Sequence, residues 1–193
     1  MVKYTECPNC NRITVVMENG EMRKNQHGQF SSLANVTQSF LVRPRGSSRP
    51  AVPPQVPKDI AEDYSEACLV IADSPKASAA LSRRCLQHLL REAAGVKHSN
   101  LFSEIQEVID SSALPSYITE GLDAVRVSGN FAAHPIKSTQ TGEILPVEPG
   151  EAEWNLDILE TLFDFYYVQP DIVAKKKAAL NAKLQSSGKP PLR

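Results

Sequence analysis

LDAVRVSGNFAAHP, residues 122–135, combines the pattern of a core helix with a line of polar side chains. Arg126, Asn130 and His134 follow one another at intervals of four residues. A helix places residues at this spacing on one face, and small or apolar residues lie beside them in this stretch. The stretch therefore predicts a helix that packs into a core and carries one candidate site.

Helical patterns continue on both sides of this stretch, where apolar residues recur every three or four positions. Ser74 before Pro75 predicts one helix start, Asn100 predicts another, and Gly95 predicts an end. The expected helices cover residues 58–72, 75–95, 101–114, 116–133 and 154–168. We therefore expect a mainly α fold, a bundle of four to five helices.

The first part of the chain has a different character. Residues 13–17 and 30–42 are rich in β-branched and other strand-forming side chains, and Asn19-Gly20 predicts a turn between them. We expect a small β-hairpin or three-stranded ribbon module over residues 1–43. Such a sheet buries too little surface to be stable without further support.

The rest of the chain is expected to consist of a linker, a helical domain and a C-terminal tail. Residues 44–56 are rich in proline and arginine and predict an extended linker. Residues 57–170 are expected to form the helical domain, with a surface loop at 136–153 and the most apolar helix after it. Residues 171–193 begin with a lysine-rich stretch and predict a mobile, partly helical tail.

Composition narrows the class of protein. The 193 residues are 41% hydrophobic, and 21 basic against 22 acidic residues leave a net charge of -1. This lacks the overall basic excess typical of strong nucleic-acid binders, although a local basic groove is compatible with it. With no long apolar run and no secretory pattern at its start, the chain is expected to be cytoplasmic and to have no membrane partner. Cys68 and Cys85 lie in helical apolar patterns and are expected to be buried, reduced thiols.

Cys7 and Cys10 form a CPNC motif, which is half of a zinc-ribbon site. Two thiolates at this spacing can bind one tetrahedral ion, but a closed structural site needs two more ligands. The sequence offers no obvious second pair, and His27 is the nearest other candidate. We therefore favour a degenerate ribbon without metal and expect no cofactor, with zinc at Cys7 and Cys10 as the alternative.

Arg83 and Arg84 lie on the second expected helix, near acidic residues of the first, including Glu66. One interpretation is a set of ion pairs between these helices. The other is that an arginine faces the Arg126 and His134 stripe and binds phosphate, which suits a guanidinium group. Arg83, Arg84 and Glu66 are therefore candidate ligand-binding residues.

His134 is expected at the end of its helix, where the helix dipole favours the charged imidazole. A role as general acid or base near neutral pH is therefore physically reasonable. The alternative is structural: His134 and Asn130 cap the helix and form hydrogen bonds to a neighbouring helix. From the residues alone the structural interpretation is favoured.

Three segments together carry a family resemblance. YSEA at 64–67, LSRRCL at 81–86 and VRVSGNFAAHP at 125–135 resemble the prokaryotic domain of unknown function 4145 over residues 57–170. Members often carry a cysteine-bearing module before the helical domain. That family is similar to the HEPN helical bundles of toxin–antitoxin and antiphage systems, whose active members are metal-independent RNases that function as dimers.

The HEPN signature is an arginine, a polar residue, three variable residues and a histidine. Asn130 and His134 match the last two fixed positions, whereas Gly129 stands where the arginine is expected. The resemblance implies a homodimeric interaction module that binds RNA, a nucleotide or a protein partner in a defence or toxin–antitoxin system. The alternative it implies is a metal-independent endoribonuclease in which His134 is the acid/base, Arg126 stabilises the phosphorane and Asn130 orients the reacting groups.

Overall fold

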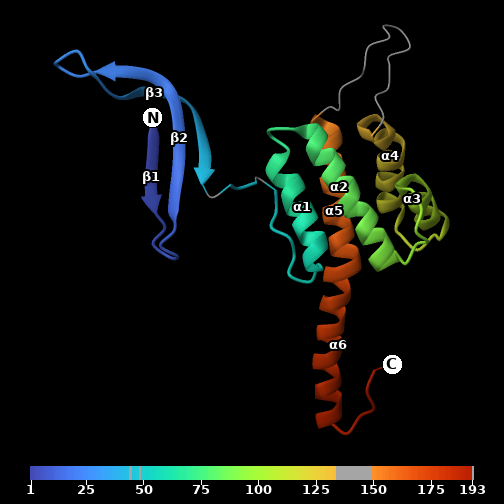
Figure 1. The fold of residues 1–193 in the computed structure, drawn as a ribbon. Coiled ribbons are helices and arrows are strands. Elements are labelled where there is room, and N and C mark those ends of the chain that lie inside the picture. Colours follow the sequence, from blue (N-terminus) through green and yellow to red (C-terminus); the bar gives the residue numbers. More distant parts are fainter. Residues whose placement is uncertain (44, 48, 134–148, 193) are drawn as a thin grey trace, which may run out of the picture. The chain divides into compact units, whose positions relative to one another are not determined.

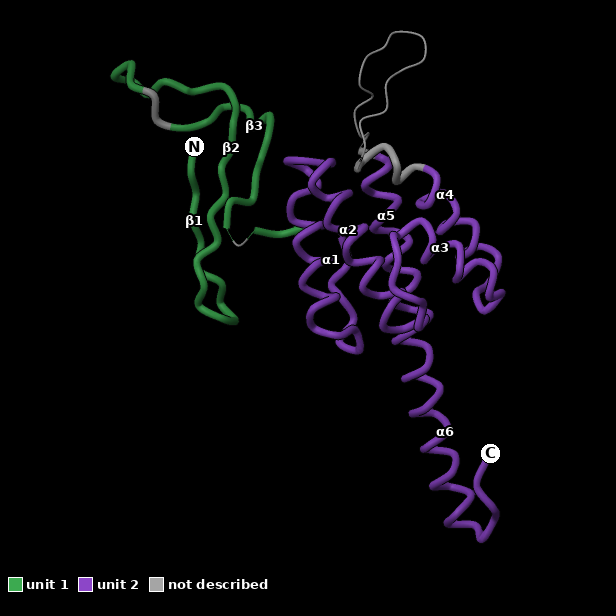
Figure 2. Tube along the Cα trace, turned by 45° about the vertical axis from the view of Figure 1, so that its right-hand side comes forward, with its two compact units in different colours: residues 1–48 green, residues 49–193 purple. Residues whose placement is uncertain are grey.

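The computed structural model describes residues 1–43, 45–47, 49–133 and 149–192, without the side chains of residues 30, 31, 128–133 and 149. The chain divides into two compact units, residues 1–48 and residues 49–193 (Figure 2). The boundary lies inside the segment rich in proline and arginine. The mainly α fold preceded by a β module is confirmed, and the two units are described separately below.

The first unit is a three-stranded antiparallel sheet with the strand order β1-β2-β3. Its strands are β1 (Val2–Glu6), β2 (Ile13–Lys24) and β3 (Phe30–Arg43), shown in blue to cyan in Figure 1. None of its described side chains is fully buried. The sheet is therefore held mainly by the hydrogen bonds of its two ladders and has no core of its own.

The predicted turn at Asn19-Gly20 is wrong, because β2 continues through both residues. The pairing with β3 shifts between Asn19 and Gly20, which marks a bulge or a comparable irregularity in the ladder. A side chain on Gly20 would overlap the backbone of Asn35, so glycine is needed for close approach of the strands. The chain turns later, where the Asn25 side chain accepts the backbone N–H groups of His27 and Gln29 at 2.9 and 3.0 Å.

The second unit consists of helices (Figure 1). In chain order they are α1 (Lys58–Val70), α2 (Pro75–Leu89), η1 (Leu90–Ala94), α3 (Leu101–Asp110), α4 (Ser116–Ala133), α5 (Pro149–Phe163), η2 (Asp164–Val168) and α6 (Gln169–Ser186). Both η elements are single π-helical turns that continue the helix before them. Among the described residues, no helix has the length and apolar character needed to cross a membrane.

Local sequence explains where these helices begin and end. The Ser74 hydroxyl accepts the Ala77 backbone N–H at 3.2 Å, and the Asn100 side chain accepts the Ser103 N–H at 2.9 Å. Both contacts satisfy N–H groups that the first turn leaves unpaired. Gly95 ends η1 with a φ of 67°, a left-handed conformation that glycine adopts without steric cost. These three predicted boundaries are confirmed.

The core of this unit lies where α1 and α5 pack against α2 and where α4 packs against α3 and α5. Tyr64 of α1 meets Phe163 of α5 edge to face, with ring centroids 5.3 Å apart. Cys68 and Cys85 are buried in this core as predicted. The apolar helix expected at 154–168 does close the core, through Leu156, Leu159, Leu162 and Phe163.

That helix begins earlier and reaches further than the sequence pattern suggests. Residues 149–153, predicted as part of a loop, form the first turns of α5, while the loop predicted at 136–148 lies outside the described residues. At the other end η2 joins α5 to α6, so the segment expected as a partly helical tail contains an 18-residue helix. None of the residues of α6 is buried.

Candidate functional site

Arg126 is held by α3 and by its own helix. Its Nη2 lies 2.6 Å from Asp123 Oδ1, and its guanidinium carbon lies 4.6 Å from the centre of the Phe102 ring of α3. The ion pair and the cation–π contact fix the guanidinium and balance its charge. Asn130 and His134 lie outside the part of the chain whose side chains are described.

Arg83 reaches α4 from α2. Its Nη1 donates a hydrogen bond to the Val125 carbonyl oxygen at 3.2 Å. Burial lowers the pKa of Arg83, because the charged form loses hydration at this position. Among the described side chains no carboxylate pairs with it, so the described contacts leave its charge unbalanced.

The contact between Arg83 and Val125 lies one helical turn before Gly129 on α4. A helical carbonyl points along the axis toward the residue four positions later, which for Val125 is Gly129. The Arg83 guanidinium, bound to the Val125 oxygen, therefore lies at the turn that contains Gly129. The structure thus brings an arginine of α2 against the backbone of α4.

Arg84 and Glu66 differ from Arg83 in their surroundings. Arg84 Nη2 lies 3.0 Å from Asp63 Oδ1 of α1, so the predicted ion pair between these helices forms with Asp63 and not with Glu66. Glu66 is exposed and lies beside a shallow hollow along α1. Because Arg83 turns to α4 and Arg84 turns to α1, the two arginines do not share one site.

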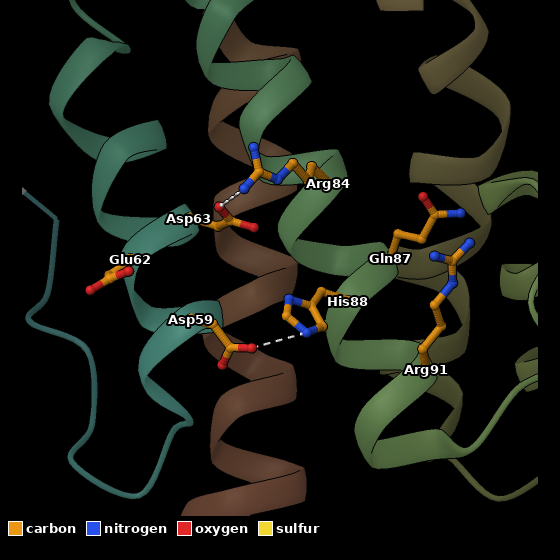
Figure 3. Close-up of a pocket in the computed structure, with 7 residues that line it drawn as sticks. All are labelled: Asp59, Glu62, Asp63, Arg84, Gln87, His88 and Arg91. Atoms are coloured by element: carbon orange, nitrogen blue, oxygen red, sulfur yellow. Dashed lines mark ion pairs between the residues drawn. The ribbon is translucent and has the colours of Figure 1, made fainter.

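A second polar region, missed by the sequence analysis, lies between α1 and α2 (Figure 3). It is a hollow of about 290 Å³. Its lining residues are Asp59, Glu62, Asp63, Arg84, Gln87, His88 and Arg91. The sequence does contain a polar stripe on each of these helices, with spacings of three and four residues. Only the packing of α1 against α2 shows that the two stripes face each other.

Most charges around this hollow are paired. His88 Nε2 lies 3.1 Å from Asp59 Oδ2, and Arg91 binds Glu104 Oε1 with its Nη2 at 2.7 Å. With Arg84 held by Asp63, both arginines of the hollow are neutralised by carboxylates. The hollow is therefore less suited to a phosphate than the surroundings of Arg83.

Cys7 and Cys10 lie in the tight connection between β1 and β2. The Cys7 N–H donates to the Arg12 carbonyl at 2.9 Å, and the Asn11 N–H donates to the Cys7 carbonyl at 2.8 Å. Backbone N–H groups of Asn9 and Cys10 donate to the Cys7 sulfur and lower its pKa, which favours the thiolate that a metal requires. No third metal-binding side chain joins this pair within the described ranges.

Comparison with known proteins identifies the family. Residues 65–186 match the family model described as Domain of unknown function (DUF4145). The match covers more than half of the chain, which therefore belongs to the DUF4145 family. It starts in α1 and runs through α6, so it begins later and ends later than the predicted range of 57–170. No curated protein and no solved structure matches the chain significantly.

Proposed function

We propose that this DUF4145 protein is a helical module that binds the phosphate groups of RNA or of a nucleotide, with Arg83 as its main anion-binding side chain. The observation that carries the proposal is the hydrogen bond from Arg83 Nη1 to the Val125 oxygen at 3.2 Å. It holds a partly buried guanidinium against the backbone of α4. A guanidinium in such a place retains N–H donors for the oxygens of a phosphate.

Arg83 suits this role better than Arg126. The sequence resemblance to HEPN proteins leaves Gly129 where an arginine is expected, and the position of Arg83 at that turn supports it as the replacement. Arg126 is bound to Asp123 and stacked on Phe102, so its charge is already balanced by a carboxylate. We therefore assign Arg126 a supporting role.

Asn130 and His134 complete the proposed site on grounds of sequence. They follow Gly129 at one and five residues, and their spacing of four residues predicts that they share one helical face. In this scheme Asn130 orients the phosphate and His134 binds it as a charged imidazolium. The proposed homodimer, and the role in bacterial defence or in a toxin–antitoxin system, rest on the family resemblance.

A metal-independent endoribonuclease is the second candidate, and the position of Arg83 favours it. The 2′-oxygen would form a bond to the adjacent phosphorus while the bond to the 5′-oxygen breaks. His134 would take the 2′-hydroxyl proton, and a second acid, such as His134 of another copy, would protonate the leaving oxygen. Arg83 would stabilise the extra negative charge on the phosphorane.

Binding is tested by fluorescence anisotropy with labelled single-stranded RNA, and with a labelled nucleoside triphosphate as a second probe. Arg83→Gln removes the charge but keeps an N–H donor for Val125. We expect it to weaken binding about tenfold, because this is the loss of affinity expected when one charge-assisted hydrogen bond is removed. Arg84→Gln is the matched control, because Arg84 is bound to Asp63, and it should bind as the parent does. Equal binding by Arg83→Gln and parent would overturn the assignment.

Cleavage separates the two candidates. The purified protein is incubated with RNA in EDTA, and growth is followed after expression in a bacterial host. Cleavage and growth arrest that disappear in His134→Ala and in Arg83→Gln would establish the endoribonuclease. Binding without cleavage or arrest would establish the binding module.

A further inference from the structure

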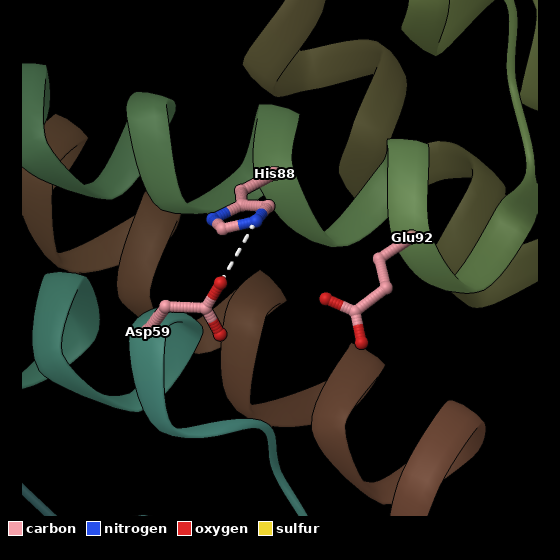
Figure 4. A group of neighbouring side chains, drawn as sticks. All are labelled: Asp59, His88 and Glu92. Atoms are coloured by element: carbon pink, nitrogen blue, oxygen red, sulfur yellow. Dashed lines mark ion pairs between the residues drawn. The ribbon is translucent and has the colours of Figure 1, made fainter.

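Three side chains that can bind a metal ion meet where α1 passes the end of α2 (Figure 4). They are Asp59 of α1, His88 of α2 and Glu92 of η1, and a ligand atom from each lies within 4.8 Å of the others. Asp59 Oδ2 and His88 Nε2 are 3.1 Å apart. The cluster is separate from the proposed phosphate site, because it faces α1 whereas Arg83 faces α4.

Two features of the fold bring these groups together. His88 and Glu92 are four residues apart and so project from the same side of one continuous helical segment. Glu92 belongs to the π-helical turn η1, and turns of this kind are rare and frequently found at functional sites. Packing of α1 against α2 then supplies the carboxylate of Asp59.

Tyr167 provides a second observation, because its hydroxyl interacts electrostatically with the carboxylates of this cluster. It belongs to the second π-helical turn, η2, and its hydroxyl is buried with no hydrogen-bond partner among the described residues. Burial raises the pKa of Tyr167 to about 12, and the carboxylates of Glu92 and Asp59 contribute to this shift. A buried hydroxyl normally has a partner, and water bound to a metal ion would provide one.

We propose that Asp59, His88 and Glu92 bind one divalent transition-metal ion, with Zn²⁺ as the best match. Zn²⁺ accepts both imidazole nitrogen and carboxylate oxygen as ligands, whereas Mg²⁺ and Ca²⁺ prefer oxygen alone. Ligands about 2.0–2.1 Å from a tetrahedral ion lie about 3.3 Å apart. The distance of 3.1 Å between Asp59 and His88 already suits this geometry, and the exposed Glu92 side chain can close the third contact by rotation.

Three protein ligands leave the fourth position of the ion for water. Asp59 and His88 also line the hollow of about 290 Å³ in Figure 3, so this open position is accessible from solvent. The ion links α1 to the segment formed by α2 and η1. Binding therefore stabilises the helical unit as well as creating an open metal centre.

The test uses the full chain carrying Cys7→Ser and Cys10→Ser, which removes these two cysteines as competing ligands. Zn²⁺ is titrated by calorimetry after treatment with a chelator, and Co²⁺ binding is followed by visible absorption. We expect one ion per chain, a Co²⁺ spectrum without a thiolate charge-transfer band, and a higher unfolding temperature with Zn²⁺.

Glu92→Gln and His88→Ala should each weaken Zn²⁺ binding more than about tenfold, since even loss of a residue that supports a ligand costs 10–100-fold. Glu92→Gln is isosteric and exposed, so it tests the site without a change of fold. Glu62→Gln and His98→Ala, which alter exposed residues outside the cluster, should bind as the parent does. Zn²⁺ affinity that is absent in the parent, or equal in the parent and Glu92→Gln, would overturn the proposal. Neither result bears on RNA binding by Arg83.

Discussion

Glu104 is a carboxylate with no exposure to solvent, and its contacts explain how it keeps its charge. Its Oε1 accepts hydrogen bonds from Arg91 Nε at 2.8 Å and from the Ser99 N–H at 2.7 Å. Burial alone would raise the pKa of Glu104, but these hydrogen bonds outweigh burial and hold the pKa below its ordinary value. The residue therefore ties the segment after η1 to α3 through a charged contact.

Glu104→Gln should destabilise the protein by about 2 kcal/mol at neutral pH, the usual value of hydrogen bonds to a charged group. Because the folded pKa lies below the unfolded pKa of about 4.3, this stabilisation is complete above that value and is lost as pH falls through the folded pKa. Urea unfolding of parent and variant from neutral to acidic pH should show a difference that shrinks on acidification. A difference that stays constant would contradict this account.

The contacts of the arginines show what could not be predicted from the sequence alone. Arg83 and Arg84 have the same chemistry, yet neighbours on a helix point about 100° apart, and only packing shows which one meets α4. Asp123 could have been recognised as a partner of Arg126 from its spacing of three residues. Phe102 could not have been recognised as a partner of Arg126 from the sequence, because it lies on another helix.

At the scale of elements, the crossing of α4 and α5 depends on one glycine. The indole N–H of Trp154 donates to the Gly121 carbonyl at 3.2 Å, and a side chain on Gly121 would overlap Cδ1 of Ile158. Since Ile158 is nearly buried, its side chain has little room to move away. The absence of a side chain at position 121 therefore sets how closely the two helices approach.

Gly121→Ala should destabilise the protein by about 1 kcal/mol, since overpacking costs about 1–3 kcal/mol and the better helix propensity of alanine returns about 1. In an Ile158→Val background, which lacks the obstructing methyl group, the same change should be neutral or stabilising. Gly150→Ala, where a side chain meets nothing within 4 Å, is the control and should be neutral or stabilising. Chemical denaturation of the four variants measures these differences, and equal costs in both backgrounds would contradict the packing argument.

The elements that sequence predicted best are those fixed by local chemistry. The caps at Ser74 and Asn100 and the end at Gly95 were confirmed because they depend on backbone groups a few residues away. The π-helical turns were missed, since such turns are rare and occur mostly as short interruptions of an α-helix. The prediction of a turn at Asn19-Gly20 was wrong because glycine is common both in turns and at irregular positions of a strand. Only the pairing with β3 shows which of the two occurs here.

At the scale of the whole molecule, the described core belongs to one unit. Every fully buried apolar side chain in the described ranges lies between Val56 and Phe163, whereas none of the described side chains of the sheet is fully buried. The helical unit thus carries the hydrophobic stabilisation that drives folding. The family match also falls entirely within it.

A fragment of residues 49–193 should therefore fold on its own and unfold cooperatively within a few degrees of the full chain. A fragment of residues 1–48 should lack stable structure, because a sheet without a core is marginal in water. Circular dichroism melts and amide NMR spectra of both fragments test this prediction. An unfolded 49–193 fragment would show that its stability depends on the N-terminal module.

The proposed phosphate contact of Arg83 is tested most directly by the salt dependence of RNA binding. Each phosphate neutralised on a single strand contributes about -0.7 to the slope of log affinity against log salt concentration. We predict that Arg83→Gln lowers the affinity and makes the slope shallower by about this amount, while Arg84→Gln leaves both as in the parent. Arg83→Gln with the affinity and slope of the parent would contradict the account.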